Sequence, residues 1–177
     1  MNLFLLSVSI VCAEPPVQVA KTGQTTSYRT GDDGYWQKGV DSPTPRFTDN
    51  GDGTITDELT GLMWAKDANH GQMTWNAGID YCNNLILGSE SCSSSYMDWR
   101  LPNAKELQSL IDVSNYKKAL PSGHPFLNVQ SSQYWSSSTY AGGTDETWSA
   151  FMDWGYVFSF LNKTNDVGAV WPVRGGN

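Results

Sequence analysis

The spacing of apolar residues toward the end of the chain is that of β-strands. After residue 130, apolar side chains recur at every second position, as Trp148, Ala150 and Met152 do. This period of two is typical of strands, whose side chains point alternately to opposite faces. Clusters of Gly, Asp and Asn between the runs are typical of turns. The pattern predicts four strands, over residues 134–137, 147–152, 156–161 and 168–173.

A hairpin signal lies earlier in the chain. Two short β-prone runs, 46–48 and 54–56, flank the sequence DNGDG. Asn-Gly and Asp-Gly between two such runs are a strong signal for a tight turn, because these residues tolerate positive φ. A second turn at Thr60 and Gly61 leads into another apolar run, 62–65. We therefore expect three consecutive strands here.

Two helices are expected between these strand regions. Thr74 can cap the first, whose apolar residues are four, three and four positions apart and so share one face: Trp75, Ile79, Cys82 and Ile86. The second begins at Asn103, with Glu106 three positions later as in a capping box. Its buried stripe comprises Leu107, Leu110 and Ile111. The order of hairpin, two helices and antiparallel meander predicts an α+β domain.

The first residues predict export. Residues 3–11 form an apolar run of nine, too short to span a bilayer and typical of a signal-peptide core. We expect residues 1–13 to be a signal peptide cleaved after Ala13. No Lys or Arg precedes the run, so a true start upstream stays an open alternative, as does a buried N-terminal strand. Residues 14–45, rich in Gly, Thr, Pro and Asp, predict an extended arm without a helix, packed on a domain of residues 46–177.

The predicted export and cleavage decide which cysteines remain in the mature chain and whether they pair. Cleavage removes Cys12 and leaves two cysteines, Cys82 and Cys92. An even pair in an exported chain predicts one disulfide, which here closes the Ser-rich loop of residues 88–98 onto the first helix.

Charge and composition exclude several classes of protein. With 39 % hydrophobic and only 16 % charged residues, the 177-residue chain is too apolar to be disordered and is large enough for one domain. The net charge of −7 argues against nucleic acid as a partner and against an anionic membrane surface, since both need a basic face. No segment beyond the signal peptide is long and apolar enough for a transmembrane helix, so we do not expect an integral membrane protein.

Four stretches resemble the Lcl C-terminal domain family, a bacterial group named after a collagen-like adhesin. They are RFTDNGDGTITD with LTGLMW (46–57 and 59–64), DWRLPN with KEL (98–103 and 105–107), YWSSS (134–138) and VRGG (173–176). The resemblance covers residues 21–176. It implies a C-type-lectin-like fold, with two helices packed on a mostly antiparallel sheet and a long loop region presenting a ligand surface. It also implies that the two ends of the chain meet in one sheet, and that the protein is exported to the periplasm, the medium or the bacterial cell surface.

A calcium site is the alternative interpretation of the hairpin turn. An EF-hand loop needs carboxylates at positions one, three and five, Gly at six and Glu at twelve. With Gly53 at six, Thr48 falls at position one and Leu59 at twelve, so both ends fail. The sequence therefore favours a plain turn and no cofactor, with Ca²⁺ left open at four candidate ligands: Asp49, Asn50, Asp52 and Asp57.

Catalysis is the least expected function. Arg100-Leu101-Pro102 also occurs in formylglycine-generating enzymes, but those need a redox-active cysteine pair near the C-terminus and no cysteine follows Cys92. There is no G-x-S-x-G elbow, and neither His70 nor His124 has a partner spaced for a triad. Both histidines are expected in surface loops, and the chain is not expected to be an enzyme.

The aromatic residues carry the functional hypothesis. Trp64, Trp75, Trp99 and Trp135 lie within the motifs and apolar patterns and are expected in the core. In the run 156–161, aromatic residues alternate with Val157, Ser159 and Leu161, and a sheet with one buried face cannot easily hide both sets. Exposed aromatics beside acidic residues suit stacking on sugar rings or a protein interface, unless a second layer of loops buries them. The candidate ligand-binding residues are Tyr140, Asp145, Glu146, Trp148, Asp153, Trp154, Tyr156 and Phe158.

These observations favour a non-catalytic binding or adhesion module that recognises a glycan or a protein. The alternative is a structural subunit of a cell-surface assembly, in which the aromatic face contacts a neighbouring copy, so a homo-oligomer stays open.

Overall fold

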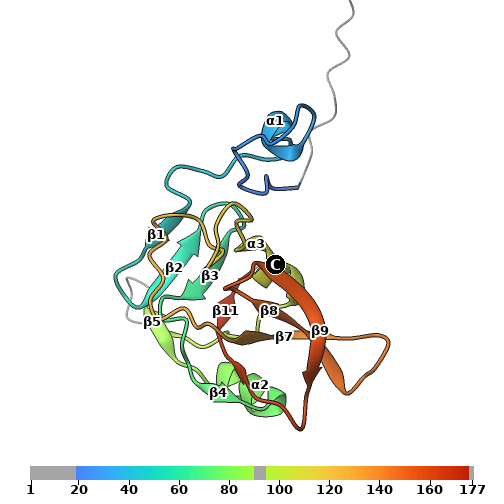
Figure 1. The fold of residues 1–177 in the computed structure, drawn as a ribbon. Coiled ribbons are helices and arrows are strands. Elements are labelled where there is room, and N and C mark those ends of the chain that lie inside the picture. Colours follow the sequence, from blue (N-terminus) through green and yellow to red (C-terminus); the bar gives the residue numbers. More distant parts are fainter. Residues whose placement is uncertain (1–18, 90–94, 176–177) are drawn as a thin grey trace, which may run out of the picture.

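The computed structural model describes residues 19–89 and 95–175 and shows a mixed α+β domain with mostly antiparallel sheets (Figure 1). The first sheet has the order β1 (Phe47–Asp49), β2 (Thr54–Asp57), β3 (Leu62–Ala65), β11 (Val173–Arg174). The second has the order β4 (Gln72–Met73), β10 (Gly168–Ala169), β7 (Gln133–Thr139), β8 (Glu146–Phe151), β9 (Tyr156–Asn162). The third pairs β5 (Leu87–Ser89) with β6 (Ser95–Tyr96). The helices are α1 (Asp33–Trp36), α2 (Trp75–Asn83) and α3 (Ala104–Ser109).

The predicted hairpin is confirmed. β1 pairs antiparallel with β2, and Asp49 opposite Ile55 is the pair nearest the turn. Gly51 and Gly53 within the turn have φ values of 78° and 90°, which other residues adopt only with strain. β2 then pairs with β3 as expected. The Asn-Gly and Asp-Gly pattern thus fixed the position of this turn.

The two predicted helices are present, and the second is correct in its capping. The Asn103 side chain accepts hydrogen bonds from the backbone amides of Lys105 and Glu106, and the Glu106 carboxylate accepts one from the Asn103 amide. The first helix is shorter than predicted, because α2 ends at Asn83 and the Asn84 amide bonds back to the carbonyl of Asp80. Ile86, expected on its buried face, lies beyond the helix and is 60 % exposed.

The predicted meander holds for β7, β8 and β9 but not for the last strand. The segment expected as one strand over 168–173 is two short strands in different sheets. β10 lies parallel to β7 and antiparallel to β4, whereas β11 pairs antiparallel with β3. Val170, Trp171 and Pro172 separate them. Proline has no amide to donate, and the Trp171 indole donates to the carbonyl of Ala65 at 2.8 Å. β11 also brings the C-terminal part of the domain into the same sheet as the hairpin, as the resemblance implied.

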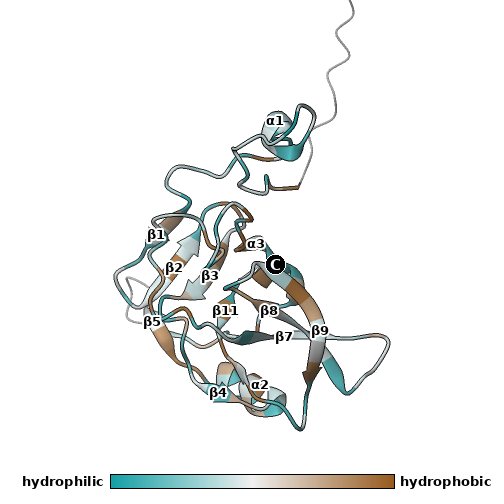
Figure 2. Ribbon diagram, in the orientation of Figure 1, coloured by the Kyte–Doolittle hydropathy of each residue, from teal (hydrophilic) through white to brown (hydrophobic). Residues whose placement is uncertain are grey.

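The main core lies between the two larger sheets and is rich in tryptophan. Trp64 packs against Trp171 with ring centroids 5.5 Å apart, and Phe126 meets Trp171 edge-on at 4.9 Å. Trp64, Trp99 and Trp135 are buried as expected, whereas Trp75 is half-buried. The sequence patterns did not identify Trp171, which is completely buried. Figure 2 shows apolar residues along β9, while the region around α1 is mostly hydrophilic.

The arm differs from its prediction. The predicted signal peptide, residues 1–13, lies outside the described residues. The arm carries one turn of helix, α1, although none was expected there; the Asp32 side chain caps it by accepting from the Tyr35 amide at 2.8 Å. The arm meets the domain where the Val113 amide donates to the carbonyl of Thr22 at 3.0 Å. Among the described residues, no helix is long and apolar enough to cross a membrane.

The predicted Cys82–Cys92 disulfide does not appear in the described structure. Cys82 is a free thiol on the inner face of α2 and is completely buried with Trp135, Leu161 and Val170. Cys92 lies outside the described residues. Burial in these apolar surroundings raises the pKa of the Cys82 thiol to about 12. The helical spacing that placed Cys82 on the buried face of α2 was correct. The bond to Cys92 stays a prediction, because its second cysteine lies outside the described residues.

Candidate functional site

Five aromatic side chains form a continuous surface patch, called here the aromatic surface. It comprises Tyr116, Phe151, Trp154, Tyr156 and Phe158. The Phe151 and Trp154 rings stack with centroids 6.3 Å apart and planes at 17°. Tyr156 lies 5.9 Å from Phe151 and 5.1 Å from Phe158, and Tyr116 meets Trp154 edge-on at 5.6 Å. Each ring therefore contacts at least one other, and the surface links two strands with a loop.

Strand register places three of these rings on one face of the sheet. Phe151 of β8 is directly opposite Tyr156 of β9, and Ser149 is opposite Phe158. Side chains two positions apart share a face, so Phe151, Tyr156 and Phe158 project together. Trp148 and Ala150 alternate with them and belong to the other face.

The turn between β8 and β9 brings Trp154 onto this surface. The amides of Trp154 and Gly155 both donate to the carbonyl of Phe151, at 3.2 and 3.0 Å. Gly155 has a φ of 70°, and a Cβ there would lie 2.8 Å from the Cβ of Ala119. Only glycine fits this close approach without displacement, so the position of Trp154 depends on Gly155.

A neighbouring loop supplies Tyr116. The Lys117 amide donates to the carbonyl of Asp153 at 3.0 Å, and the Ala119 amide donates to that of Met152 at 2.6 Å. These two bonds attach the loop to the β8–β9 turn. Sequence reasoning missed Tyr116, because nothing in the sequence links it to a turn so far along the chain. It also missed Phe151, although the alternation in 147–152 placed this side chain on the other face of the strand from Ala150 and Met152.

Exposure distinguishes the aromatic surface from the core. Trp154 is 56 % exposed, Tyr156 45 % and Tyr116 62 %. Phe151 and Phe158 are half-buried beneath them. Apolar side chains with this much exposure, grouped in one patch, are typical of interaction sites.

The other candidate ligand residues do not all join this surface. Tyr140 and Trp148 form a separate edge-on pair, 5.7 Å apart. Asp145 accepts a hydrogen bond from Asn162 at 3.0 Å, and Glu146 begins β8 at the far end from Trp154. Asp153, by contrast, lies in the β8–β9 turn beside Trp154. The structure therefore brings together Asp153, Trp154, Tyr156 and Phe158, and separates them from Tyr140, Asp145, Glu146 and Trp148.

The calcium candidates in the hairpin turn bond to protein groups. Asp49 forms an ion pair with Lys66 at 2.6 Å, and this bond holds the pKa of the Asp49 carboxyl below its ordinary value. Asp57 is paired with Arg46. Asn50 donates to the hydroxyl of Thr54, and Asp52 accepts from the amide and hydroxyl of Thr54. In residues 19–89 and 95–175, no three His, Cys, Asp or Glu side chains are grouped as metal ligands would be.

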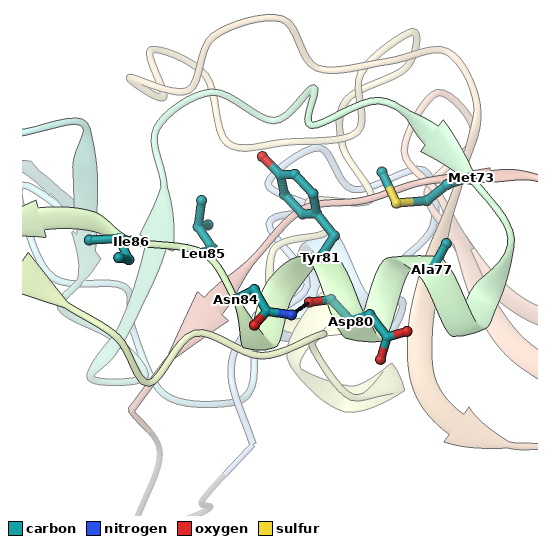
Figure 3. A pocket seen from close by; sticks show the side chains of 7 residues that line it. All are labelled: Met73, Ala77, Asp80, Tyr81, Asn84, Leu85 and Ile86. Carbon is teal, nitrogen blue, oxygen red and sulfur yellow. Dashed lines mark hydrogen bonds between the residues drawn. The ribbon is translucent and has the colours of Figure 1, made fainter.

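An apolar depression of about 580 Å³ lies beside α2, apart from the aromatic surface (Figure 3). Its lining residues are Met73, Ala77, Asp80, Tyr81, Asn84, Leu85 and Ile86. The Tyr81 hydroxyl lies 2.8 Å from Nδ1 of His70, and the Asn84 side chain donates to the carbonyl of Asp80. The Tyr81 hydroxyl and the Asn84 amide thus bond within the protein.

The two histidines are half-buried, and each contacts an aromatic ring that is not part of the aromatic surface. His70 contacts Tyr81, and His124 packs near Phe126 with ring centroids 5.8 Å apart. Burial lowers the pKa of both imidazoles below the ordinary value of 6.5. Within residues 19–89 and 95–175, neither imidazole is hydrogen-bonded to a carboxylate that would orient it as a general base.

The model of a family described as the Lcl C-terminal domain matches residues 53–174, a span that contains every residue of the aromatic surface. No curated protein matches the chain.

Proposed function

Because the chain belongs to the Lcl C-terminal domain family, we propose that it is a non-catalytic binding or adhesion module that recognises a glycan or protein ligand through the aromatic surface. The proposal includes a C-type-lectin-like fold and a site of action outside the bacterial cytoplasm. It rests on one observation above the others: Tyr116, Trp154 and Tyr156 are about half exposed. Four other tryptophans are buried, namely Trp64, Trp99, Trp135 and Trp171.

The chemistry of the aromatic surface supports binding. Ring faces stack on the apolar faces of sugars, and aromatic side chains dominate the energetics of protein interfaces. The rings are also held in place before any ligand arrives, since Phe151 and Trp154 stack and the loop with Tyr116 is bonded to the turn. A preformed site loses little conformational entropy on binding.

The test begins with the chain lacking its predicted signal peptide, applied to arrays of glycans and of cell-surface proteins. Trp154→Ala is then compared with Trp36→Ala on whichever ligand is retained. The two tryptophans are matched controls, because both are 56 % exposed and Trp36 lies on the arm. We expect Trp154→Ala to weaken binding by about tenfold or more, since an anchoring aromatic contributes about 2 kcal/mol at an interface.

Two results decide the outcome. Equal losses for Trp154→Ala and Trp36→Ala would refute the assignment to the aromatic surface, as would full affinity in Trp154→Ala. Tyr140→Ala tests the separate Tyr140–Trp148 pair, and a loss there without one at Trp154 would move the site to that pair.

A further inference from the structure

A row of three side chains crosses the second sheet from the aromatic surface to Gln133. Gln133 of β7 is directly opposite Phe151 of β8, which is directly opposite Tyr156 of β9. Residues directly opposite in antiparallel strands project from the same face of the sheet. Two positions along β7 from Gln133, Trp135 is completely buried and packs with Cys82 of α2. Gln133 therefore lies between the aromatic rings and the part of this face that α2 covers.

The side-chain amide of Gln133 is available to a ligand. Gln133 is half-buried, and among the described residues its amide forms no hydrogen bond. Two other glutamines of this region are bonded: the Gln72 amide donates to the Ser132 hydroxyl, and the Gln130 amide donates to the carbonyl of Asn128. A primary amide offers two donors and one acceptor. The row thus places hydrogen-bonding capacity directly beside exposed rings.

The strands that carry this row are almost uncharged. β7, β8 and β9 contain one charged residue, Glu146, which begins β8 at the end far from the β8–β9 turn. At that turn lie charges of both signs, Asp153 in the turn itself and Lys117 and Lys118 in the neighbouring loop. A charged ligand would leave water without a partner of opposite charge along the row, which is costly. The row containing Gln133 therefore favours an uncharged ligand.

Resting on the proposed function, we propose that the ligand of the aromatic surface is an uncharged oligosaccharide. Its sugar rings stack on Trp154 and Tyr156, and its hydroxyls bond the Gln133 amide. A sugar presents C–H groups on its ring face and hydroxyls at its edge, which matches rings beside an amide. The row crosses two strand spacings, about 10 Å in all, so a ligand that contacts both ends is longer than one sugar. An apolar protein surface would instead desolvate the amide without pairing it.

Binding to defined sugars tests the ligand class. The probes are uncharged hexasaccharides of glucose, galactose, mannose and N-acetylglucosamine, with oligogalacturonate as the charged comparison, applied to the chain lacking its predicted signal peptide. We expect calorimetry to detect binding of at least one uncharged probe, with affinity unchanged by added salt because screening acts on charges. Cell-surface proteins stripped of their glycans are the protein comparison and should not be retained.

Gln133→Leu tests the amide itself. The variant keeps a side chain of similar size but loses the hydrogen-bonding groups, so affinity for the uncharged probe should fall about fivefold, the factor of one net hydrogen bond. Gln108→Leu is the matched control, because Gln108 is exposed on α3, whose Leu107 and Leu110 pack in the main core on the other face of the sheet. It should bind like the unaltered chain.

Nuclear magnetic resonance supplies a readout that needs no variant to fold. The side-chain NH₂ signals of Gln133 should shift when the uncharged probe saturates the protein, while those of Gln108 stay in place. Unshifted Gln133 signals at saturation would remove the amide from the site.

The inference is also overturned by binding of charged probes alone or of glycan-free proteins alone, by retention of no uncharged probe, or by full affinity in Gln133→Leu. The proposed function survives any of these results in which Trp154→Ala still weakens binding. Full affinity of Trp154→Ala for an uncharged probe would instead refute the aromatic surface as the site, and this inference with it.

Discussion

Arg46 holds Asp57 through two parallel hydrogen bonds, with Nε 3.1 Å from Oδ1 and Nη2 3.0 Å from Oδ2. The Asp57 side chain is completely buried and that of Arg46 is 10 % exposed. Nη2 of Arg46 also donates to the carbonyl of Ser109 at 2.7 Å. The pair therefore joins the hairpin to the end of α3, and it explains structurally why both residues stand in the RFTDNGDGTITD motif.

Arg46→Ala should lower the free energy of unfolding by about 3–5 kcal/mol, because it leaves the Asp57 carboxylate buried without a partner. Chemical denaturation measures this change. Arg29→Ala, on the exposed part of the arm, is the control and should alter stability by less than about 0.5 kcal/mol. A loss below about 1 kcal/mol for Arg46→Ala would show that water or another group replaces the guanidinium.

Trp99→Ala should unfold the domain or cost about 3–5 kcal/mol, since the side chain is 2 % exposed and its indole donates to the carbonyl of Leu87 at 3.1 Å. Trp154→Ala should leave the melting temperature nearly unchanged. Thermal denaturation of the two variants compares them directly. Comparable losses would place Trp154 in the core and contradict the aromatic surface.

Stability should fall as pH is lowered from about 7 to 5. Burial lowers the pKa of His70 and His124 below 6.5. The folded state thus favours the neutral imidazoles, and the unfolded state binds more protons below the ordinary pKa. The free energy of unfolding therefore decreases as pH falls from about 6.5 toward the folded-state pKa values.

Denaturant titrations at several pH values measure this dependence. The double variant His70→Gln with His124→Gln should have a flatter profile between pH 7 and 5. An unchanged slope in the double variant would assign the pH dependence to other groups.

The Cys82 thiol should resist alkylation in the folded protein at neutral pH, because burial raises its pKa to about 12 and the thiolate is the reactive form. Mass spectrometry of peptides after labelling, with and without denaturant, checks this. Detection of a Cys82–Cys92 bond in protein recovered from an oxidising compartment would contradict the free thiol.

A chelator should leave the melting temperature unchanged, since Asp49 and Asp57 are paired with Lys66 and Arg46. Asp52→Ala should lower stability by about 1 kcal/mol, because Thr54 loses its acceptor at 2.6 Å. Neither change should affect ligand binding. A rise in melting temperature on adding calcium would reverse this interpretation of the hairpin turn.

Local sequence signals identified the elements whose causes are local. The turn at DNGDG and the capping box at Asn103 depend on residues a few positions apart, and both are present. The three strands of the meander followed from the period of two, to within one or two residues at each end. Elements specified by residues close together in the sequence could therefore be predicted from the sequence alone.

Features created by tertiary contacts were not predictable in this way. β10 and β11 have two residues each, too few to show a period, and their sheets are set by partners far along the chain. Half of the candidate ligand residues lie at the aromatic surface. Alternation groups Tyr156 with Phe158 and Trp148 with Ala150, but only the register between β8 and β9 shows that these two groups take opposite faces. Tyr116 joins the aromatic surface only through the bonds between its loop and the β8–β9 turn.

The pairing of β3 with β11 also sets an order of assembly. Trp171 and Ala65, joined by the indole hydrogen bond, lie 106 positions apart in the chain. During synthesis β1, β2 and β3 emerge long before β11, so the apolar strand β3 waits with one edge unpaired. Contacts this distant close slowly, and an unpaired apolar edge invites association with other chains. In a product truncated before residue 171, that edge of β3 would stay unpaired. Pairing with β11 therefore also protects the protein against aggregation.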